Sequence, residues 1–412
     1  MDQPLKLLEG IGLELELMIV DAQTLDVFPI ADRVLFEASG NQSGDHDAGR
    51  IGWSNELVLH LVELKMNAPE RSLAGIAAAF QENVRALEAL LEKHGARLMP
   101  TGMHPWMDPR RETVLWPHEY GEVYRTYDRL FDCRRHGWAN LQSVHVNLSF
   151  GDDQEFGRLH AAVRLILPLV PALAASSPLQ DGRATGLLDN RLEAYRTNAE
   201  RMPLMSGAIV PEAVFDRASY RRAILDPLEA EVARLEPSGV LQGDWMNARG
   251  AIARFDRDAL EIRLLDTQET PLADVAVAWA VYCVVRDLCR ERWSSERHQR
   301  AFELEPLCAL LARTTAEGPH ARIDAPGYAR ALGWRRNDVP TAGELWDSLV
   351  EDCVTVHPQT TPELLAPLQC ILRKGTLSQR ILRALGATPA RAQVHELYRE
   401  LCDCLRSGRL FQ

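Results

Sequence analysis

The stretch 12–20 predicts a β-strand with one apolar and one acidic face. Side chains alternate between the two faces of a strand, so Glu14 and Glu16 share one face. The opposite face is apolar throughout: Leu13, Leu15, Leu17 and Ile19. Two ionised carboxylates this close repel each other. A bound hard cation such as Mg²⁺ would remove the repulsion, whereas a solvated outer face would tolerate it. This strand alone leaves both interpretations open.

A second apolar stretch, 57–64, predicts a strand buried on both faces. Glu63 lies inside it, where an unpaired charge would cost several kcal/mol. Glu56 is seven residues earlier. On one regular strand the two would face opposite ways, so both reach one site only if the chain bends or bulges near Glu56. A helix would put them on the same face, and a salt bridge from Glu63 to Lys65 would explain Glu63 without any site.

Two later stretches repeat the pattern of one polar and one apolar face. In 141–150, His145 and Asn147 share the polar face with serines; a lone histidine there is usually just hydrogen-bonded. In 260–266, Glu261 and Arg263 share one face. They could be neighbours on an exposed surface. They would equally suit a site that holds a metal and a phosphate.

The remaining pattern predicts the elements around these strands. We expect residues 25–30 to return as the second strand of a hairpin and 39–52 to form a polar, mobile loop. An amphipathic helix spans 72–95, with Ser72 as its N-cap. From Pro271 onward the pattern is mostly helical, over 272–292, 303–313, 342–354, 361–373, 377–385 and 390–406.

The loop 176–186 carries two glycines and Arg183. Its backbone N–H groups and the guanidinium could bind a carboxylate or phosphate, but it lacks the P-loop pattern. Arg191 follows on a predicted helix. The alternative for both arginines is solvated surface.

Composition excludes several classes of protein. The 412-residue chain has a net charge of −12, which argues against general binding to nucleic acid or anionic membranes. The most apolar stretch, 272–289, carries three charges and predicts a buried helix. The first residues lack a signal-peptide profile, so we expect a cytoplasmic protein. None of the eight cysteines has zinc-site spacing.

Six motifs in order resemble the glutamate–cysteine ligase family of the second type, including the bacterial carboxylate–amine ligases. They are Gly12-Leu13-Glu14-Leu15-Glu16, Glu56-Leu57 with Val62-Glu63, Thr101-Gly102-Met103-His104-Pro105, His145-Val146-Asn147, Ser176-Ser177-Pro178 with Gly182-Arg183, and Arg254-Phe255 with Leu260-Glu261-Ile262-Arg263. Each motif is weakly specific, and their common order carries the resemblance.

The resemblance implies an α+β fold with a glutamine-synthetase-like, curved, mostly antiparallel sheet. That sheet would form a funnel-shaped active site backed by helices. The implied catalytic region is 1–290, with a helical C-terminal region, 291–412, packed on the same domain. The resemblance also implies ATP as co-substrate and Mg²⁺ or Mn²⁺, held by Glu14, Glu16, Glu56, Glu63, His145 and Glu261. Arg263 and Glu63 would be catalytic, and Arg183, Arg191, Asn147 and Arg254 would contact substrate or nucleotide.

The implied reaction joins a carboxylate, most simply the γ-carboxylate of glutamate, to cysteine or another amine through an acyl phosphate. Expected partners are small amino acids or amines, with neither nucleic acid nor membrane, and the chain could form a homodimer. Relatives often have a third acidic residue where this chain has Leu15, and a histidine or glycine beside His145. These departures affect the amino acid pocket more than the metal set. The alternatives are a non-catalytic binding or regulatory relative and a metal-dependent amide hydrolase.

Overall fold

One sheet organises the fold, and all of its pairings among the described residues are antiparallel. The computed structural model describes residues 5–241, 243–356, 362–386 and 388–412. The strand order is β2-β3-β4-β1-β6-β10-β9, and β5 also pairs with β1. The strands are β1 (Ile11–Asp21), β2 (Asp45–Ala48), β3 (Ile51–Asn55), β4 (Leu61–Met66), β5 (Ala96–Met99), β6 (Ser143–Ser149), β9 (Ala251–Arg254) and β10 (Ala259–Asp266). The expected mostly antiparallel α+β fold is confirmed.

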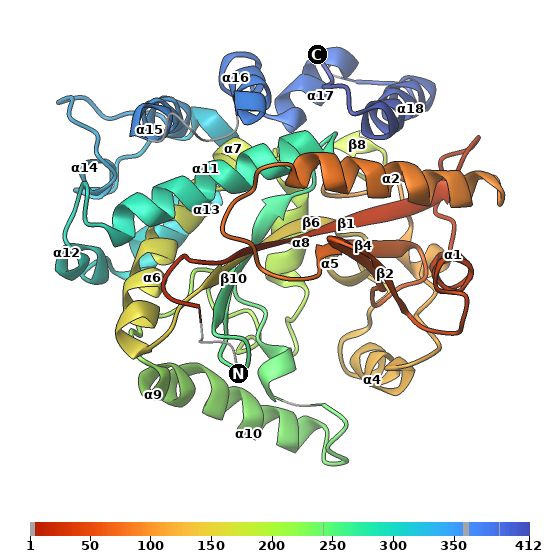
Figure 1. Ribbon diagram of the computed structural model, residues 1–412, viewed down its shortest axis with the longest axis horizontal. Coiled ribbons are helices and arrows are strands. Elements are labelled where there is room, and N and C mark those ends of the chain that lie inside the picture. Colours follow the sequence, from red (N-terminus) through yellow and green to blue (C-terminus); the bar gives the residue numbers. More distant parts are fainter. Residues whose placement is uncertain (1–4, 242, 357–361, 387) are drawn as a thin grey trace.

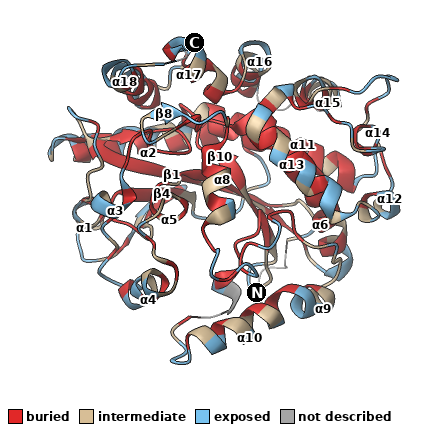
Figure 2. Ribbon diagram, turned by 180° about the vertical axis from the view of Figure 1, so that it is seen from behind, coloured by how far each residue is buried: buried red, intermediate tan, exposed pale blue. Residues whose placement is uncertain are grey.

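The apolar face of β1 is covered by helices, as its alternation predicts. Leu13, Leu15 and Leu17 are fully buried in the main core. The covering helices are α2 (Ile76–Glu92), α6 (Asp153–Ile166) and α11 (Pro271–Cys289); α11 contacts both of the others as well as β1 and β6. Figure 1 shows α2 and α11 lying together along one side of β1. In Figure 2 the strands β1, β4 and β10 are buried, whereas the outer helix α10 (Asp226–Leu235) also carries exposed residues. The opposite, polar face of β1 is therefore free to form a site.

Helix α2 keeps its predicted apolar stripe but begins later than predicted. Its N-cap is Gly75, in the left-handed conformation with φ 72°, so Ser72 is not the cap. The Ser72 hydroxyl instead accepts from the Ala74 N–H. Glycine adopts this conformation without a Cβ penalty, which explains why the helix begins there. The buried stripe includes Ile76, Phe80, Val84, Leu87 and Leu91.

Two predictions on short stretches are wrong. The polar stretch 39–52 is not all loop, because it holds β2 and the start of β3, paired as a hairpin. Residues 25–30 do not form a strand; only Val27 forms a bridge, to Val20. Alternating exposed side chains at β2 carried no apolar signal, so periodicity could not identify it.

The remaining helices surround the sheet and dominate the C-terminal part, as predicted. Before α11 they are α1 (Ala31–Ser39), α3 (Pro109–Glu112), α4 (Gly121–Phe131), α5 (His136–Ala139), α7 (Pro171–Ala174), α8 (Asn190–Thr197) and α9 (Arg217–Tyr220). After it come α12 (Glu296–Arg300), α13 (Leu304–Glu317), α14 (Tyr328–Ala331), α15 (Ala342–Val356), α16 (Leu365–Lys374), α17 (Leu377–Leu385) and α18 (Arg391–Ser407). The predicted helix start at Thr361 lies outside the described residues.

The last two helices return to the sheet. Helix α18 contacts β5 and α2. On α17, Arg380 is buried and its Nη1 lies 2.6 Å from Oε1 of Glu269, just beyond β10. Among the residues that the structure describes, no helix is both long enough and apolar enough to cross a membrane.

Candidate active site

The acidic and polar strand faces identified in the sequence meet on one face of the sheet. In the ladders, Glu14 on β1 is opposite His145 on β6, and Glu16 is opposite Glu63 on β4. Glu261 on β10 is opposite Asn147 on β6. Residues opposite each other in antiparallel strands have Cβ atoms about 5 Å apart. Three strand pairings therefore bring distant acidic residues together.

Glu56 and Glu63 reach this face from two strands, not from one. The prediction of a single strand over 57–64 is wrong, because β4 begins only at Leu61, and no helix forms there either. The chain does turn between Glu56 and Glu63, which is the condition for both to reach one site. Ser54 on β3 pairs with Glu63 on β4, and Glu56 directly follows β3, before the connection into β4. The predicted ion pair of Glu63 is also present. Nζ of Lys65 lies 3.3 Å from Oε2 of Glu63, which also accepts from the Ser54 hydroxyl at 2.6 Å.

His145 holds the centre of the cluster. Its Nδ1 is 3.0 Å from Oε2 of Glu14 and 4.0 Å from Oε1 of Glu261, and its Nε2 is 3.0 Å from Oγ of Ser143. Burial acts to raise the pKa of Glu14, but the hydrogen bond and charge of His145 outweigh it and lower that pKa to about 2. Asn147 donates to the other oxygen of Glu14 at 3.0 Å.

The other carboxylates are less well compensated. Burial, with the nearby charge of Glu14, raises the pKa of Glu63 to about 7. Burial and the charges of Glu16 and Glu63 raise the pKa of Glu56 well above its usual range. Glu14, Glu63 and His145 offer ligand atoms that all lie within 4.8 Å of one another. Carboxylate oxygens gathered this closely fit a divalent cation, which prefers oxygen ligands.

Glu261 lies between two arginines. Nε of Arg254 is 2.8 Å from its Oε2, and Nε of Arg263 is 3.2 Å from its Oε1. Burial acts to raise the pKa of Glu261, but these two guanidinium groups lower it overall. The β10–β6 register shifts between Ile262 and Leu265, so Arg263 lies at an irregularity in the ladder. Such bulges re-aim side chains near active sites.

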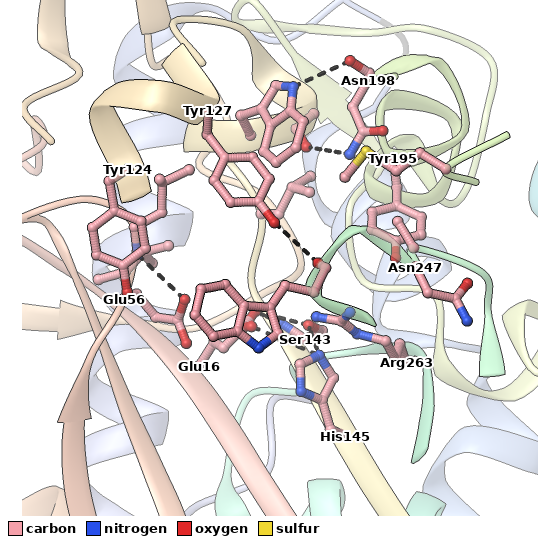
Figure 3. Close-up of a pocket in the computed structure, with 18 of the residues that line it drawn as sticks. Glu16, Glu56, Tyr124, Tyr127, Ser143, His145, Tyr195, Asn198, Asn247 and Arg263 are labelled. Carbon is pink, nitrogen blue, oxygen red and sulfur yellow. Dashed lines mark hydrogen bonds and ion pairs between the residues drawn. The ribbon is translucent and has the colours of Figure 1, made fainter. Parts of the chain in front are cut away.

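A cavity of about 470 Å³ opens over this face. Its floor is polar, and its upper part is aromatic, supplied by α4, α5, α8 and the segment before β9 (Figure 3). The hydroxyl of Tyr127 donates to the backbone oxygen of Trp245 at 3.0 Å across the upper part. The floor residues are Glu16, Glu56, Ser143, His145, Arg191, Arg254 and Arg263, and the aromatic residues are Tyr120, Tyr124, Tyr127, Trp138, Tyr195 and Trp245.

The sequence reasoning missed this aromatic group. A signal was present: Tyr120, Tyr124 and Tyr127 have the spacing of one helix face. Trp138 and Trp245 come from separate irregular regions, where no periodicity marks them. Asp266 was also missed, although it ends the predicted strand 260–266.

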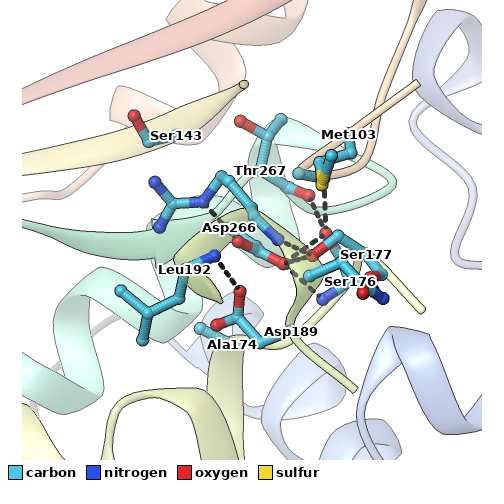
Figure 4. A network of polar contacts seen from close by, with 12 residues as sticks. Met103, Ser143, Ala174, Ser176, Ser177, Asp189, Leu192, Asp266 and Thr267 are labelled. Atoms are coloured by element: carbon cyan, nitrogen blue, oxygen red, sulfur yellow. Dashed lines mark hydrogen bonds and ion pairs between the residues drawn. The ribbon is translucent and has the colours of Figure 1, made fainter. Parts of the chain in front are cut away.

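Arg191 belongs to a buried network beneath the cavity, so the surface alternative is wrong for it. Its Nε pairs with Asp266, and its terminal nitrogens lie 3.4 Å from the backbone oxygen of Arg263. Asp266 also accepts from the Ser176 N–H at 2.8 Å and from the Ser177 hydroxyl at 2.7 Å, as Figure 4 shows. Arg191 lines the cavity, but the network fixes its position.

Arg183 lies apart from the cluster. It is exposed on β8 (Arg183–Ala184), which forms a small hairpin with β7 (Leu179–Gln180), and it does not line the cavity. The loop's contribution to the site comes instead from Ser176 and Ser177, through Asp266.

Comparison with known proteins assigns the family. The model of the glutamate–cysteine ligase family 2 matches residues 10–403. The chain belongs to this family. Membership makes it a ligase, in agreement with the motifs in its sequence.

Relatives support the assignment, and two solved structures share the fold. An uncharacterized protein of Archaeoglobus fulgidus is 32% identical over 79% of this chain and 89% of its own length. A Leifsonia xyli protein named "putative glutamate–cysteine ligase 2" is 29% identical over 97% of this chain and 96% of its own. The glutamate–cysteine ligase of Francisella tularensis, solved in complex with AMP, has a TM-score of 0.62 at 15% identity and covers 98% of this chain and 90% of its own. A bifunctional glutathione synthetase of Pasteurella multocida has a TM-score of 0.57 at 15% identity, over 96% of this chain and 52% of its own. At these identities the two structures establish the fold only.

Proposed function

We propose that this ligase joins glutamate, through its γ-carboxylate, to cysteine or another amine, with ATP as co-substrate and an acyl phosphate as intermediate. The observation that carries the proposal is the cluster of Glu14, Glu63 and His145 next to Glu261 and Arg263. It adjoins a cavity large enough for substrates, whose floor includes His145 and Arg263. The cavity size falls in the usual range of small-molecule sites.

The buried carboxylates are the proposed metal ligands. Glu14, Glu63 and His145 offer the tightest set, and Glu16, Glu56 and Glu261 surround it. When bound, Mg²⁺ or Mn²⁺ would offset the negative charge of the phosphoryl group as it is transferred. Asn147 and Ser143 orient the carboxylates, since they donate hydrogen bonds to Glu14 and Glu16.

Two arginines are proposed to bind substrates: Arg263 binds the transferring phosphoryl group, and Arg254 binds the acid. Arg263 is the proposed donor to the transferring phosphoryl group, because a planar guanidinium fits its oxygens. Glu261 keeps Arg263 in place, and Arg191 supports the backbone of Arg263 from below. The terminal nitrogens of Arg254 would bind the acid substrate, while its Nε stays on Glu261.

The aromatic side chains in the upper part of the cavity would keep water away from the acyl phosphate. An acyl phosphate is lost if water reaches it before the amine does. Tyr124, Tyr127 and Trp138 shield the floor from solvent, and excluding water also strengthens the electrostatic interactions there. The amine then attacks the acyl carbon, the carbon–oxygen bond to phosphate breaks, and an amide forms.

The test is a reaction with ATP, Mg²⁺, glutamate and a panel of amines, with ADP and products identified by mass. ADP release that requires both acid and amine supports the ligase. Glutamyl-amide cleavage without nucleotide would instead indicate the hydrolase alternative. An intact biological effect in Glu16→Gln and Glu261→Gln variants would indicate a non-catalytic relative.

A further inference from the structure

Among the described residues, the guanidinium groups that line the cavity all lie on or beside its floor. They belong to Arg191, Arg254 and Arg263. Arg191 pairs with Asp266, and the other two both contact Glu261. Each guanidinium therefore already has a carboxylate partner. The proposed reaction also needs them for the phosphoryl group and for the α-carboxylate of glutamate.

The upper part offers only neutral groups among the described residues. Val123, Met205 and the aromatic side chains line it. Its buried polar atoms without a hydrogen-bond partner are the hydroxyl of Tyr195 and Oδ1 of Asn198. In Figure 3 the Tyr195 hydroxyl points down toward Asn247 and Arg263. Such groups bind an amine or a hydroxyl. A carboxylate placed there would have to share Arg263 with the phosphoryl group, and a buried carboxylate without a cation of its own costs several kcal/mol.

In the proposed reaction the phosphates of ATP need not occupy the upper part of the cavity. Glu14 and Glu63 do not line the cavity, although they form the tight ligand set with His145. Glu14 is opposite Lys65 in the ladder, and the Lys65 side chain is 36% exposed. The ligand set therefore meets the cavity at His145 and extends beyond it toward Lys65. This arrangement leaves the aromatic upper part for the amine.

We infer that the acceptor is an amine that lacks a carboxylate and carries an apolar or aromatic group, not an α-amino acid. The inference rests on the proposed ligase function. In the step, the amine nitrogen bonds to the acyl carbon, the carbon–oxygen bond to phosphate breaks, inorganic phosphate leaves and the nitrogen loses a proton.

Matched amine pairs test the inference. Phenethylamine and L-phenylalanine differ by one carboxylate, as do cysteamine and L-cysteine. With ATP, Mg²⁺ and glutamate, we expect the carboxylate-free member of each pair to have a kcat/KM at least tenfold higher. Amide formation that is equal or faster with the amino acids overturns the inference but leaves the ligase function standing. No amide with any amine overturns both.

A second test introduces a cation into the upper part of the cavity. Val123→Arg places a guanidinium on the cavity side of α4, whereas Glu122→Arg places one at an exposed neighbour that does not line the cavity. We expect Val123→Arg to shift the kcat/KM ratio of phenylalanine to phenethylamine at least tenfold toward phenylalanine. Glu122→Arg should leave the ratio unchanged. An unchanged ratio in a Val123→Arg protein with normal thermal stability counts against the inference, and the wild-type pairs decide it if that variant does not fold.

Discussion

Glu16 on β1 lies directly opposite Glu63 on β4 in the central sheet, and both carboxylates are buried. Like charges directly opposite each other destabilise a sheet. Ser143 donates to Glu16 from both its backbone N–H and its hydroxyl, and Lys65 offsets part of the charge of Glu63. The pair therefore maintains a negative site at the cost of some stability.

A divalent cation should stabilise the folded protein. Ligand that binds only the folded state adds about 2.7 kcal/mol at about 100 times its dissociation constant. We expect millimolar Mg²⁺ or Mn²⁺ to raise the thermal midpoint of the wild type but not of Glu14→Gln. The control is Glu82→Gln, an exposed change on α2 that should respond like the wild type. An equal rise in Glu14→Gln would contradict the assigned ligand set.

The pKa of Glu63 predicts a pH dependence of the metal-free protein. This pKa is about 7 in the folded chain and roughly 4.3 in an unfolded one. The folded state thus binds the proton more tightly, so the stabilisation is complete below about pH 4 and is lost as the pH rises through about 7. Between pH 5 and 8 Glu63 should cost the wild type about 2 kcal/mol. In EDTA, urea unfolding of Glu63→Gln should show a correspondingly smaller loss; equal losses in both proteins would refute the assignment.

Arg263 should act on the rate of phosphoryl transfer. Arg263→Lys keeps the charge but loses the planar donor pair, so we expect kcat to fall roughly 100- to 1,000-fold, about 3–4 kcal/mol, with little change in the KM for glutamate. Arg257→Lys is the matched control, since Arg257 is exposed and pairs only with the adjacent Asp256. Steady-state ADP release measures both variants. A change confined to KM would assign Arg263 to substrate binding instead.

The network under the cavity should matter for stability. Asp266→Asn leaves the Arg191 guanidinium buried without its partner, so we expect a loss of about 3–5 kcal/mol in the free energy of unfolding. Arg196→Gln removes an exposed pair on the same helix, α8, and should cost less than about 1 kcal/mol. Urea unfolding compares the two. A small loss in Asp266→Asn would mean that Ser176 and Ser177 hold the network without the charge.

Strand periodicity found several of the proposed metal ligands because they lie on regular strands whose other face is core. Glu14, Glu16 and His145 were identified in this way, and the ladders confirm that they converge. Periodicity could not show that the chain turns between Glu56, just after β3, and Glu63 on β4, because the connection between the two strands is as apolar as the strands themselves.

Structural roles that depend on tertiary contacts could not be predicted from the sequence. The helix with Arg191 looks like a polar surface helix, and only its packing against Asp266 buries that guanidinium. His104 belongs to one of the six motifs, on a glycine- and proline-bearing turn. In the structure it is buried with its Nε2 2.7 Å from the backbone oxygen of Leu25, away from the cavity. No local pattern separates such structural roles from functional ones.

The construction of the site from β1, β4, β6 and β10 has a consequence for the order of folding. Glu14 and Glu261 are separated by more than half of the sequence, so their pairings require closure of very large loops. A refolding chain would gain affinity for divalent ions only after these late pairings form. The onset of cation binding during refolding would therefore mark the last stage of folding, well after the local helices have formed.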